Sequence, residues 1–252
     1  MINKIQLGDC LEVMKNIGDK SIDMILCDLP YGTTECKWDV IIPFDLLWKH
    51  YERVIKDEGA IVLTASQPFT SALTMSNLKM FKYSLVWKKT KIGGFAQAPY
   101  RFMTNHEDIL VFSKGGCAKN AKNRMVFNPQ DLIYRPKITK GIKANQSAQR
   151  IRKTDQQDFL SEYTNYPKSV IEIGSEFQNI HPTQKPVALF EYLIKSYTNN
   201  GALVLDNCIG SGTTAIACIN TKRNYIGIEL DKNYFDMANK RIEQHTKQQV
   251  IF

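Results

Sequence analysis

The segment Asp206–Thr214, DNCIGSGTT, decides how this chain folds. It follows the apolar residues ALVL and precedes AIACIN, so it predicts a turn from a buried strand into a helix that starts at Thr213. Gly210 and Gly212 allow the backbone to approach a ligand closely. The next apolar segment, NYIGIEL, ends near Glu229, and a carboxylate at a strand tip suits the two hydroxyls of a ribose. The pattern predicts a nucleoside-binding turn.

Two common nucleotide-binding motifs do not fit this turn. Ala215 stands where the third glycine of G-x-G-x-x-G belongs, which argues against a nicotinamide dinucleotide. No G-x-x-x-x-G-K-[ST] occurs, which argues against a phosphate-binding loop of that type. The alternative interpretation is a glycine turn that serves only helix–strand packing.

Strand and helix patterns alternate on both sides of this turn. Apolar or alternating runs predict strands at 21–28, 60–66, 83–89, 108–114, 202–208 and 224–230. Helical spacing predicts helices at 43–55, 67–75, 186–197, 213–220 and 232–245, with a short amphipathic stretch at 11–17. This alternation predicts an α/β fold with a mostly parallel sheet and helices on both faces.

The middle of the chain differs from both halves. Eleven Lys or Arg residues stand between Lys114 and Asp155, against Asp131 and Asp155, and long apolar periodicity is lost as far as about Asn179. Such a stretch buries little apolar area, so it is either flexible or ordered by a partner. Four aromatic residues are interleaved with it: Tyr134, Tyr163, Tyr166 and Phe177.

Composition limits the functional classes. The net charge of +8 and the isoelectric point of about 9.1 favour a polyanionic partner. No apolar run is long enough to span a bilayer and no secretory signal is evident, so the cytoplasm is the expected location. Six cysteines without a C-x-x-C pair, and four histidines apart from them, suggest neither a metal site nor disulfides.

The tetrapeptide Asp28-Leu29-Pro30-Tyr31 ends a predicted strand, where open α/β sheets bind ligands. The amino group of a nucleobase is a poor nucleophile because its lone pair is delocalised into the ring. The Asp28 carboxylate and the Leu29 carbonyl can accept its hydrogens, and Pro30 holds Leu29 extended. Tyr31 offers a flat face on which a flipped base can stack. The alternative is an ordinary strand-to-turn exit.

Two further segments are candidates for ligand contacts. HPTQKP, residues 181–186, precedes a predicted helix, and Lys185 with the helix N-terminus favours a carboxylate. Thr183 as a plain helix cap is the alternative. Asp9 and Cys10 open the short stretch at 11–17, where Asp9 as a helix cap is the better interpretation of the segment by itself.

Taken together, the motifs resemble the β-class amino DNA methyltransferases, the DNA N4/N6 methylase family. The matching segments occur in that family's order: GDCLEVM, SIDMILCDLPYG, HEDILVFSKG, HPTQKP, LDNCIGSGTT and YIGIEL. The resemblance covers most of the chain except about 116–177. It implies a Rossmann-like seven-stranded methyltransferase sheet, with a catalytic half at 1–113, a target-recognition insertion at 114–178, and an S-adenosylmethionine-binding half at 179–252.

The resemblance also implies roles for single residues. Asp28, Leu29, Pro30 and Tyr31 are expected at the target base. The residues expected around S-adenosylmethionine are Asp9, Cys10, Asp28, Thr183, Lys185, Asp206, Gly210, Gly212, Thr213, Thr214 and Glu229. Within this set, Asp206 and the glycines are assigned to the methionine part, Glu229 to the ribose, and Lys185 to the border of the carboxylate.

One position departs from the family's usual D-P-P-Y, since Leu29 replaces the first proline. The backbone carbonyl survives this change, and Asp28 at the first position favours adenine N6 over cytosine N4. We therefore expect base flipping and direct methyl transfer to adenine in double-stranded DNA, without a metal. A cytosine-N4 enzyme and a catalytically inactive DNA-binding relative stay open as alternatives. A homodimer and a companion restriction endonuclease are further expectations that the sequence leaves open.

Overall fold

A computed structural model describes residues 1–33, 39–139, 159–174 and 184–249. The chain forms two compact units: Met1–Asn128 together with Ser169–Phe252, and Pro129–Lys168. The larger unit contains the sheet and the helices, and the smaller contains a two-stranded hairpin.

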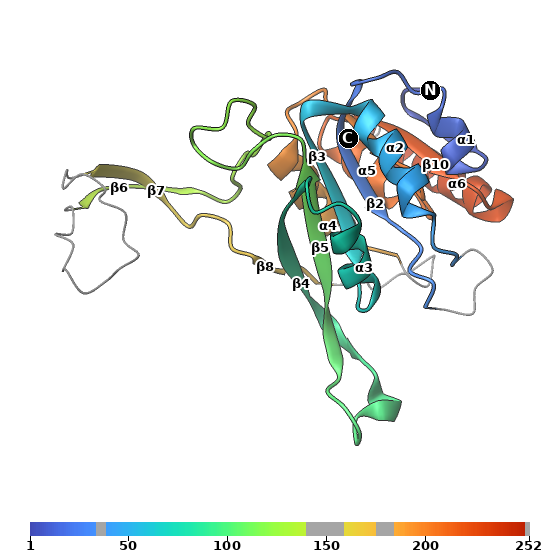
Figure 1. The fold of residues 1–252 in the computed structure, drawn as a ribbon, viewed down its shortest axis with the longest axis horizontal. Helices are drawn as coiled ribbons and strands as arrows, with labels where there is room; N and C mark the ends of the chain where they lie inside the picture. Colours follow the sequence, from blue (N-terminus) through green and yellow to red (C-terminus); the bar gives the residue numbers. More distant parts are fainter. Residues whose placement is uncertain (34–38, 140–158, 175–183, 250–252) are drawn as a thin grey trace. The chain divides into compact units, whose positions relative to one another are not determined.

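The larger unit is built on one sheet, which has eight strands in the described residues (Figure 1). In spatial order they are β1 (Lys4–Leu7), β10 (Asn224–Glu229), β9 (Leu203–Asp206), β2 (Ile22–Asp28), β3 (Ile55–Ala65), β5 (Thr104–Ser113), β4 (Phe81–Gly93) and β8 (Val170–Glu172). All run parallel except β5. The expected Rossmann-like fold is therefore confirmed, but the expected number of seven strands omits β8, which pairs with the outer edge of β4.

Helices cover both faces of the sheet because neighbouring residues of the central strands point to opposite sides. On β2, Ile25 and Cys27 join the core that packs against α1 (Cys10–Met14), α2 (Phe44–Val54) and α3 (Phe69–Ser76). Met24 and Leu26 join a second core. Its helices are α4 (Val187–Tyr197), α5 (Thr213–Asn220) and α6 (Lys232–Gln249). None of the helices in the described part of the chain is long and apolar enough to cross a membrane.

The strands predicted at 83–89 and 108–114 form an antiparallel hairpin that extends beyond the sheet (Figure 1). The pairing continues from Val86↔Asp108 through Lys88↔His106 to Gly93↔Thr104, and the short helix η1 (Phe95–Gln97) follows β4. We call residues 88–106 the β4–β5 arm. The apolar runs predicted the parts of both strands that lie within the sheet. The parts that form the arm are exposed, so they carry no apolar run that would predict a strand.

The smaller unit, Pro129–Lys168, spans fewer residues than the insertion expected at 114–178. It holds β6 (Ile133–Thr139) paired antiparallel with β7 (Phe159–Thr164), and residues 140–158 lie outside the described part. Residues 114–128 belong to the larger unit, where Met125 is buried and the Asn128 N–H donates to the Ser196 carbonyl of α4 at 2.7 Å.

Candidate active site

The two halves of the expected site meet at the carboxyl ends of β2 and β9. These strands are neighbours, with Met24 opposite Val204 and Ile25 opposite Leu205, so the loops after them open at the same edge. A pocket of about 610 Å³ lies there. The expected site residues that line it are Asp9, Cys10, Asp28, Leu29, Pro30, Tyr31, Lys185, Asp206, Gly210, Thr213, Thr214 and Glu229.

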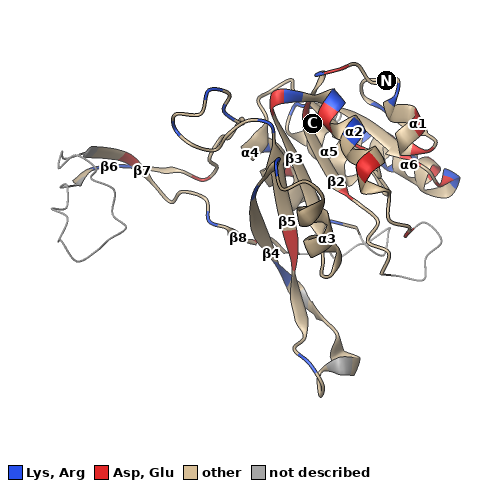
Figure 2. Ribbon diagram, viewed as in Figure 1, with Lys and Arg blue, Asp and Glu red and all other residues tan. Residues whose placement is uncertain are grey.

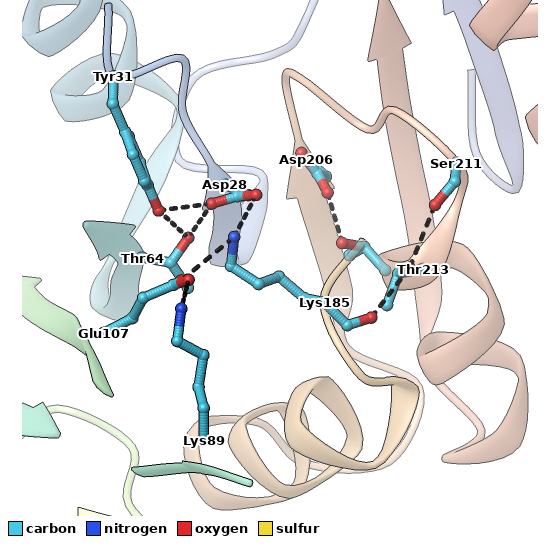
Figure 3. A network of polar contacts seen from close by, with 10 residues as sticks. Asp28, Tyr31, Thr64, Lys89, Glu107, Lys185, Asp206, Ser211 and Thr213 are labelled. Atoms are coloured by element: carbon cyan, nitrogen blue, oxygen red, sulfur yellow. Dashed lines mark hydrogen bonds and ion pairs between the residues drawn. The ribbon is translucent and has the colours of Figure 1, made fainter. Parts of the chain in front are cut away.

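Asp28 lies at the centre of a polar network in this pocket (Figure 3). Its Oδ1 accepts a hydrogen bond from the Tyr31 hydroxyl at 2.7 Å and another from the Thr64 hydroxyl. Its Oδ2 accepts from the Lys185 ammonium at 2.6 Å. The carboxylate is therefore fixed on both oxygens, from its own loop, from β3 and from the segment before α4.

Lys185 connects Asp28 to a second carboxylate (Figure 3). Its side chain is 6% exposed, and its Nζ also lies 3.3 Å from Glu107 Oε2. Burial would lower the pKa of Lys185, but the charges of Asp28 and Glu107 outweigh it and raise that pKa above its ordinary value. Glu107 Oε1 in turn accepts from Lys89 Nζ at 2.7 Å. Two carboxylates and two ammonium groups thus alternate from the tetrapeptide to β4.

The loop after Asp28 is held by its own turn and by an aromatic contact. Tyr31 stacks on Phe69 with ring centroids 5.2 Å apart, and burial together with the charge of Asp28 raises the Tyr31 pKa well above its ordinary value. The Asp39 carboxylate accepts from the backbone N–H groups of Gly32 and Thr33 at 2.8 and 2.9 Å. The tetrapeptide therefore leaves the strand in one defined conformation.

Glu229 and Gly210 form the opposite wall. Glu229 Oε2 accepts from the Gly210 N–H at 2.8 Å, and its Oε1 accepts from the Asp231 N–H at 2.9 Å. Burial raises the pKa of Glu229. Gly210 has a φ of +52°, and a Cβ built there would meet no atom within 4 Å. This glycine therefore keeps one side of the pocket open beside an acidic group.

Asp206 ends β9 beneath this wall. Its carboxylate is buried and accepts from the Thr214 hydroxyl and, at 3.1 Å, from the Cys208 N–H. Burial raises the pKa of Asp206 to about 7. The described residues place no ammonium or guanidinium group in an ion pair with Asp206 or Glu229.

Comparison with known proteins assigns the chain to a family. The family described as DNA methylase, of the N6/N4 type, matches residues 22–240. The chain belongs to this DNA methylase family. The match includes both the tetrapeptide and the glycine turn, so the expected family is confirmed.

Individual relatives cover nearly the whole methylase. The DNA adenine methyltransferase YhdJ of Escherichia coli (strain K12) is 30% identical over 258 residues, or 94% of this chain and 81% of the relative. The type II methyltransferase M.HpaI of Haemophilus parainfluenzae is 28% identical over 261 residues, or 96% and 75%. The solved M1.HpyAVI–SAM complex is 27% identical with a TM-score of 0.62, covering 94% of this chain and 98% of that one.

The cofactor of this DNA methylase is S-adenosylmethionine, as the sequence led us to expect. The residues present fit that group. A carboxylate at the tip of β10, Glu229, can accept from ribose hydroxyls, and Gly210 beside it leaves the space that any side chain would fill. Leu230 and Tyr234 add apolar lining next to Glu229.

Some expected cofactor residues have structural roles in the methylase. Gly212 is not among the residues that line the pocket. It has a φ of +82°, and a Cβ there would lie 3.3 Å from the Ala238 Cβ of α6. The Asp9 side chain caps α1 by accepting from the Leu11 N–H at 2.8 Å, while Asp9 and Cys10 also line the pocket. Thr183 lies outside the described residues.

Sequence reasoning missed four side chains of the site: Thr64, Lys89, Glu107 and Asp39. Thr64 is a single polar residue in the apolar run of β3, and it lies opposite Asp28 in the register of the two strands. Glu107 stands in the quoted motif HEDILVFSKG, directly before the buried part of β5. A polar residue at the carboxyl end of a buried strand is the signal that could have identified Thr64.

Proposed function

We propose that this methylase transfers a methyl group to the N6 amino group of adenine in DNA, with Asp28 as the acceptor that orients the amino group. The observation that supports this most directly is the shared pocket: the Asp28 carboxylate and the Gly210–Glu229 wall line one cavity. YhdJ, the most similar of the relatives described above by identity, is named a DNA adenine methyltransferase. Asp28 at the first position of the tetrapeptide agrees with that base.

The Asp28 carboxylate can accept a hydrogen of the amino group although it already has three partners. Two carboxylate oxygens offer about four lone-pair sites, and three are used by Tyr31, Thr64 and Lys185. Asp28 can therefore accept one amino hydrogen while the Leu29 carbonyl accepts the other. These two hydrogen bonds draw both hydrogens out of the plane of the base and free the nitrogen lone pair. Bound S-adenosylmethionine supplies an electrophilic methyl group on a sulfonium.

The charges around Asp28 favour the transition state of this reaction. The amino nitrogen gains positive charge as it is alkylated, and the Asp28 carboxylate lies where that charge develops. Lys185 neutralises the carboxylate enough for it to remain buried, and Glu107 balances Lys185 in turn. The nitrogen then loses a proton, which the Asp28 carboxylate can accept.

The target base reaches this pocket only if it leaves the duplex. We assign DNA docking to the insertion expected at 114–178, whose Lys and Arg residues suit phosphates. Within the smaller unit, Tyr134 and Tyr163 lie with ring centroids 5.6 Å apart, and both are exposed. We also propose a cytoplasmic location, a homodimer and a companion restriction endonuclease, the last because several relatives are named type II methyltransferases.

Labelled cofactor and duplex DNA test this function. Wild-type protein should incorporate tritiated methyl groups, and digestion to nucleosides should give N6-methyl-2′-deoxyadenosine. Label in N4-methylcytosine would replace the adenine assignment, and no label at all would indicate the inactive relative.

The Asp28→Asn variant tests the role of the carboxylate. It should lower kcat by roughly a hundredfold to ten-thousandfold, since the acceptor loses its charge. Calorimetry should show unchanged S-adenosylmethionine affinity. A normal rate for Asp28→Asn would contradict the acceptor role.

A further inference from the structure

The β4–β5 arm projects beyond the sheet (Figure 1). It carries several exposed aromatic side chains. Phe95 is 71% exposed, Tyr100 is 87% exposed and Phe102 is 99% exposed. Ile92 and Met103 are exposed beside them. Isolated exposed apolar residues need no explanation, but several on one projecting hairpin indicate a surface that binds something.

The charge of the arm indicates the class of partner. Residues 88–106 contain Lys88, Lys89, Lys91 and Arg101 and no Asp or Glu. Figure 2 shows blue and no red along the projecting end of this hairpin. Aromatic residues among basic ones suit a nucleic acid, whose bases stack on aromatic faces and whose phosphates attract Lys and Arg. Two copies of this arm would repel each other, which argues against self-association through it.

The base of the arm borders the pocket of the candidate active site. Lys89 at the start of the arm and Glu107 just beyond its end both line the pocket, and their side chains are joined at 2.7 Å. A DNA molecule that delivers a base to Asp28 must therefore pass the root of the arm. The aromatic tip extends from that root along two continuous strands.

We propose that the β4–β5 arm is a wedge that enters the duplex beside the target base and stacks an aromatic ring in the space left by the flipped nucleotide. This inference rests on the proposed function and adds a flipping device to it. Flipping removes one base from the stack, and an aromatic side chain in the gap restores stacking on the neighbouring pairs. Tyr100 and Phe102 are the rings for this role because they are the most exposed.

The double variant Tyr100→Ala/Phe102→Ala tests the wedge. With 2-aminopurine as the target base, the wild type should give a strong fluorescence increase and the variant little. The variant should also lose roughly tenfold to a hundredfold in kcat/KM for DNA, the range expected for one stacked base. Its S-adenosylmethionine affinity should be unchanged, because neither ring lines the pocket.

Two controls make the result specific. Met75→Ala removes an apolar side chain that is 67% exposed on α3, outside the arm, and should leave both signals unchanged. A mismatch opposite the target adenine lowers the cost of flipping, so it should restore most of the rate of the double variant.

The outcomes separate this inference from the proposed function. Wild-type protein that incorporates no label overturns the proposed function. A wild type that methylates DNA and a double variant that matches it in rate and fluorescence overturn the wedge alone. A double variant that changes from dimer to monomer in sedimentation, and whose lost rate a mismatch does not restore, overturns the wedge in favour of a second copy as the partner.

Discussion

The two walls of the pocket differ in how their buried carboxylates are stabilised. On the β2 side, Asp28 and Glu107 are each paired with an ammonium group, Lys185 or Lys89. On the β9–β10 side, Asp206 and Glu229 accept hydrogen bonds from uncharged groups, and neither has an ion pair within the described residues. Burial raises the pKa of both of these carboxyl groups.

The difference fits what each wall has to bind. An adenine is neutral, so the wall that receives it must balance its own charges beforehand. S-adenosylmethionine is cationic at its sulfonium and its amino group, so the opposite wall can leave its acidic groups without a protein cation until the cofactor arrives. The charges of the β2 wall are therefore balanced within the protein, and we propose that those of the β9–β10 wall are balanced by the cofactor.

Lys185→Met should remove the charge balance of the β2 wall and lower kcat more than any other substitution proposed below. It leaves two carboxylates facing each other without their shared cation, so we expect kcat to fall roughly a hundredfold. The free energy of unfolding should fall by about 3 kcal/mol, as for other buried ion pairs that lose one partner. Stopped-time methylation assays and urea denaturation measure these two changes.

The variant Lys185→Met/Glu107→Gln is the matched control. It removes one negative charge together with the positive one, so it should recover stability relative to Lys185→Met alone. If the two variants are equally unstable, charge balance is not what Lys185 provides.

The pH dependence of cofactor binding tests whether the Asp206 carboxylate is ionised when the cationic cofactor binds. The Asp206 pKa of about 7 means that much of this carboxyl is protonated below neutral pH. A cationic ligand favours the ionised form, so S-adenosylmethionine affinity should rise about tenfold per pH unit below 7 and level off above it. Calorimetry from pH 5 to 8 measures this, and Asp206→Asn should flatten the curve.

The free protein should show the opposite trend in stability. The folded state holds the Asp206 proton more tightly than the unfolded chain, whose Asp pKa is about 3.8. Stability from this group is therefore present at low pH and is lost as pH rises from about 4 to about 7. An Asp206→Asn variant that keeps the full wild-type dependence would contradict this explanation.

Gly210→Ala should have a smaller effect, confined to the cofactor. Its Cβ meets no protein atom, so the added methyl group occupies ligand space and should weaken S-adenosylmethionine binding by roughly tenfold. The positive φ should also cost about 1 kcal/mol of stability. Gly201→Ala is the control, since it has a φ of +76° and open space but does not line the pocket. Equal cofactor affinities for the two variants would contradict the assignment of Gly210 to the cofactor site.

Lys89→Met should have the smallest effect. Its ammonium pairs with Glu107 but not with Asp28, and its side chain is 25% exposed. A partly exposed pair contributes about 1 kcal/mol or less, so kcat should fall no more than about fivefold. A loss as large as that of Lys185→Met would show that the outer ion pair is as important as the inner one.

The sequence predicted the fold well where burial repeats along the chain. The central strands and all long helices appear as regular apolar patterns, because both faces of the sheet are covered. β1 was missed since it is a four-residue edge strand with polar residues, and β8 was missed since it has three residues in a polar region. The apolar patterns therefore predicted six of the eight strands, and the seven strands implied by the family resemblance were one too few.

The candidate site was predicted where it depends on local motifs and missed where it depends on distant contacts. The tetrapeptide and the glycine turn each lie within a few residues of sequence. The contact between Lys185 and Asp28 joins residues 157 positions apart, and no local pattern indicates it. The resemblance placed Lys185 in the segment that borders the cofactor's carboxylate, and the contact of its ammonium with the Asp28 carboxylate was not predicted.

The sheet interleaves strands from both ends of the chain, and this has a practical consequence. Strands of Met1–Asn128 pair with strands of Ser169–Phe252 at three places: β1 with β10, β2 with β9, and β4 with β8. A polypeptide cut within Pro129–Lys168 would leave Asp28 and Glu107 in one fragment, and Lys185, Asp206 and Glu229 in the other. Neither fragment could complete the sheet by itself. Co-expressed halves should therefore regain methylation only by complementation, with a rate that follows the product of their concentrations.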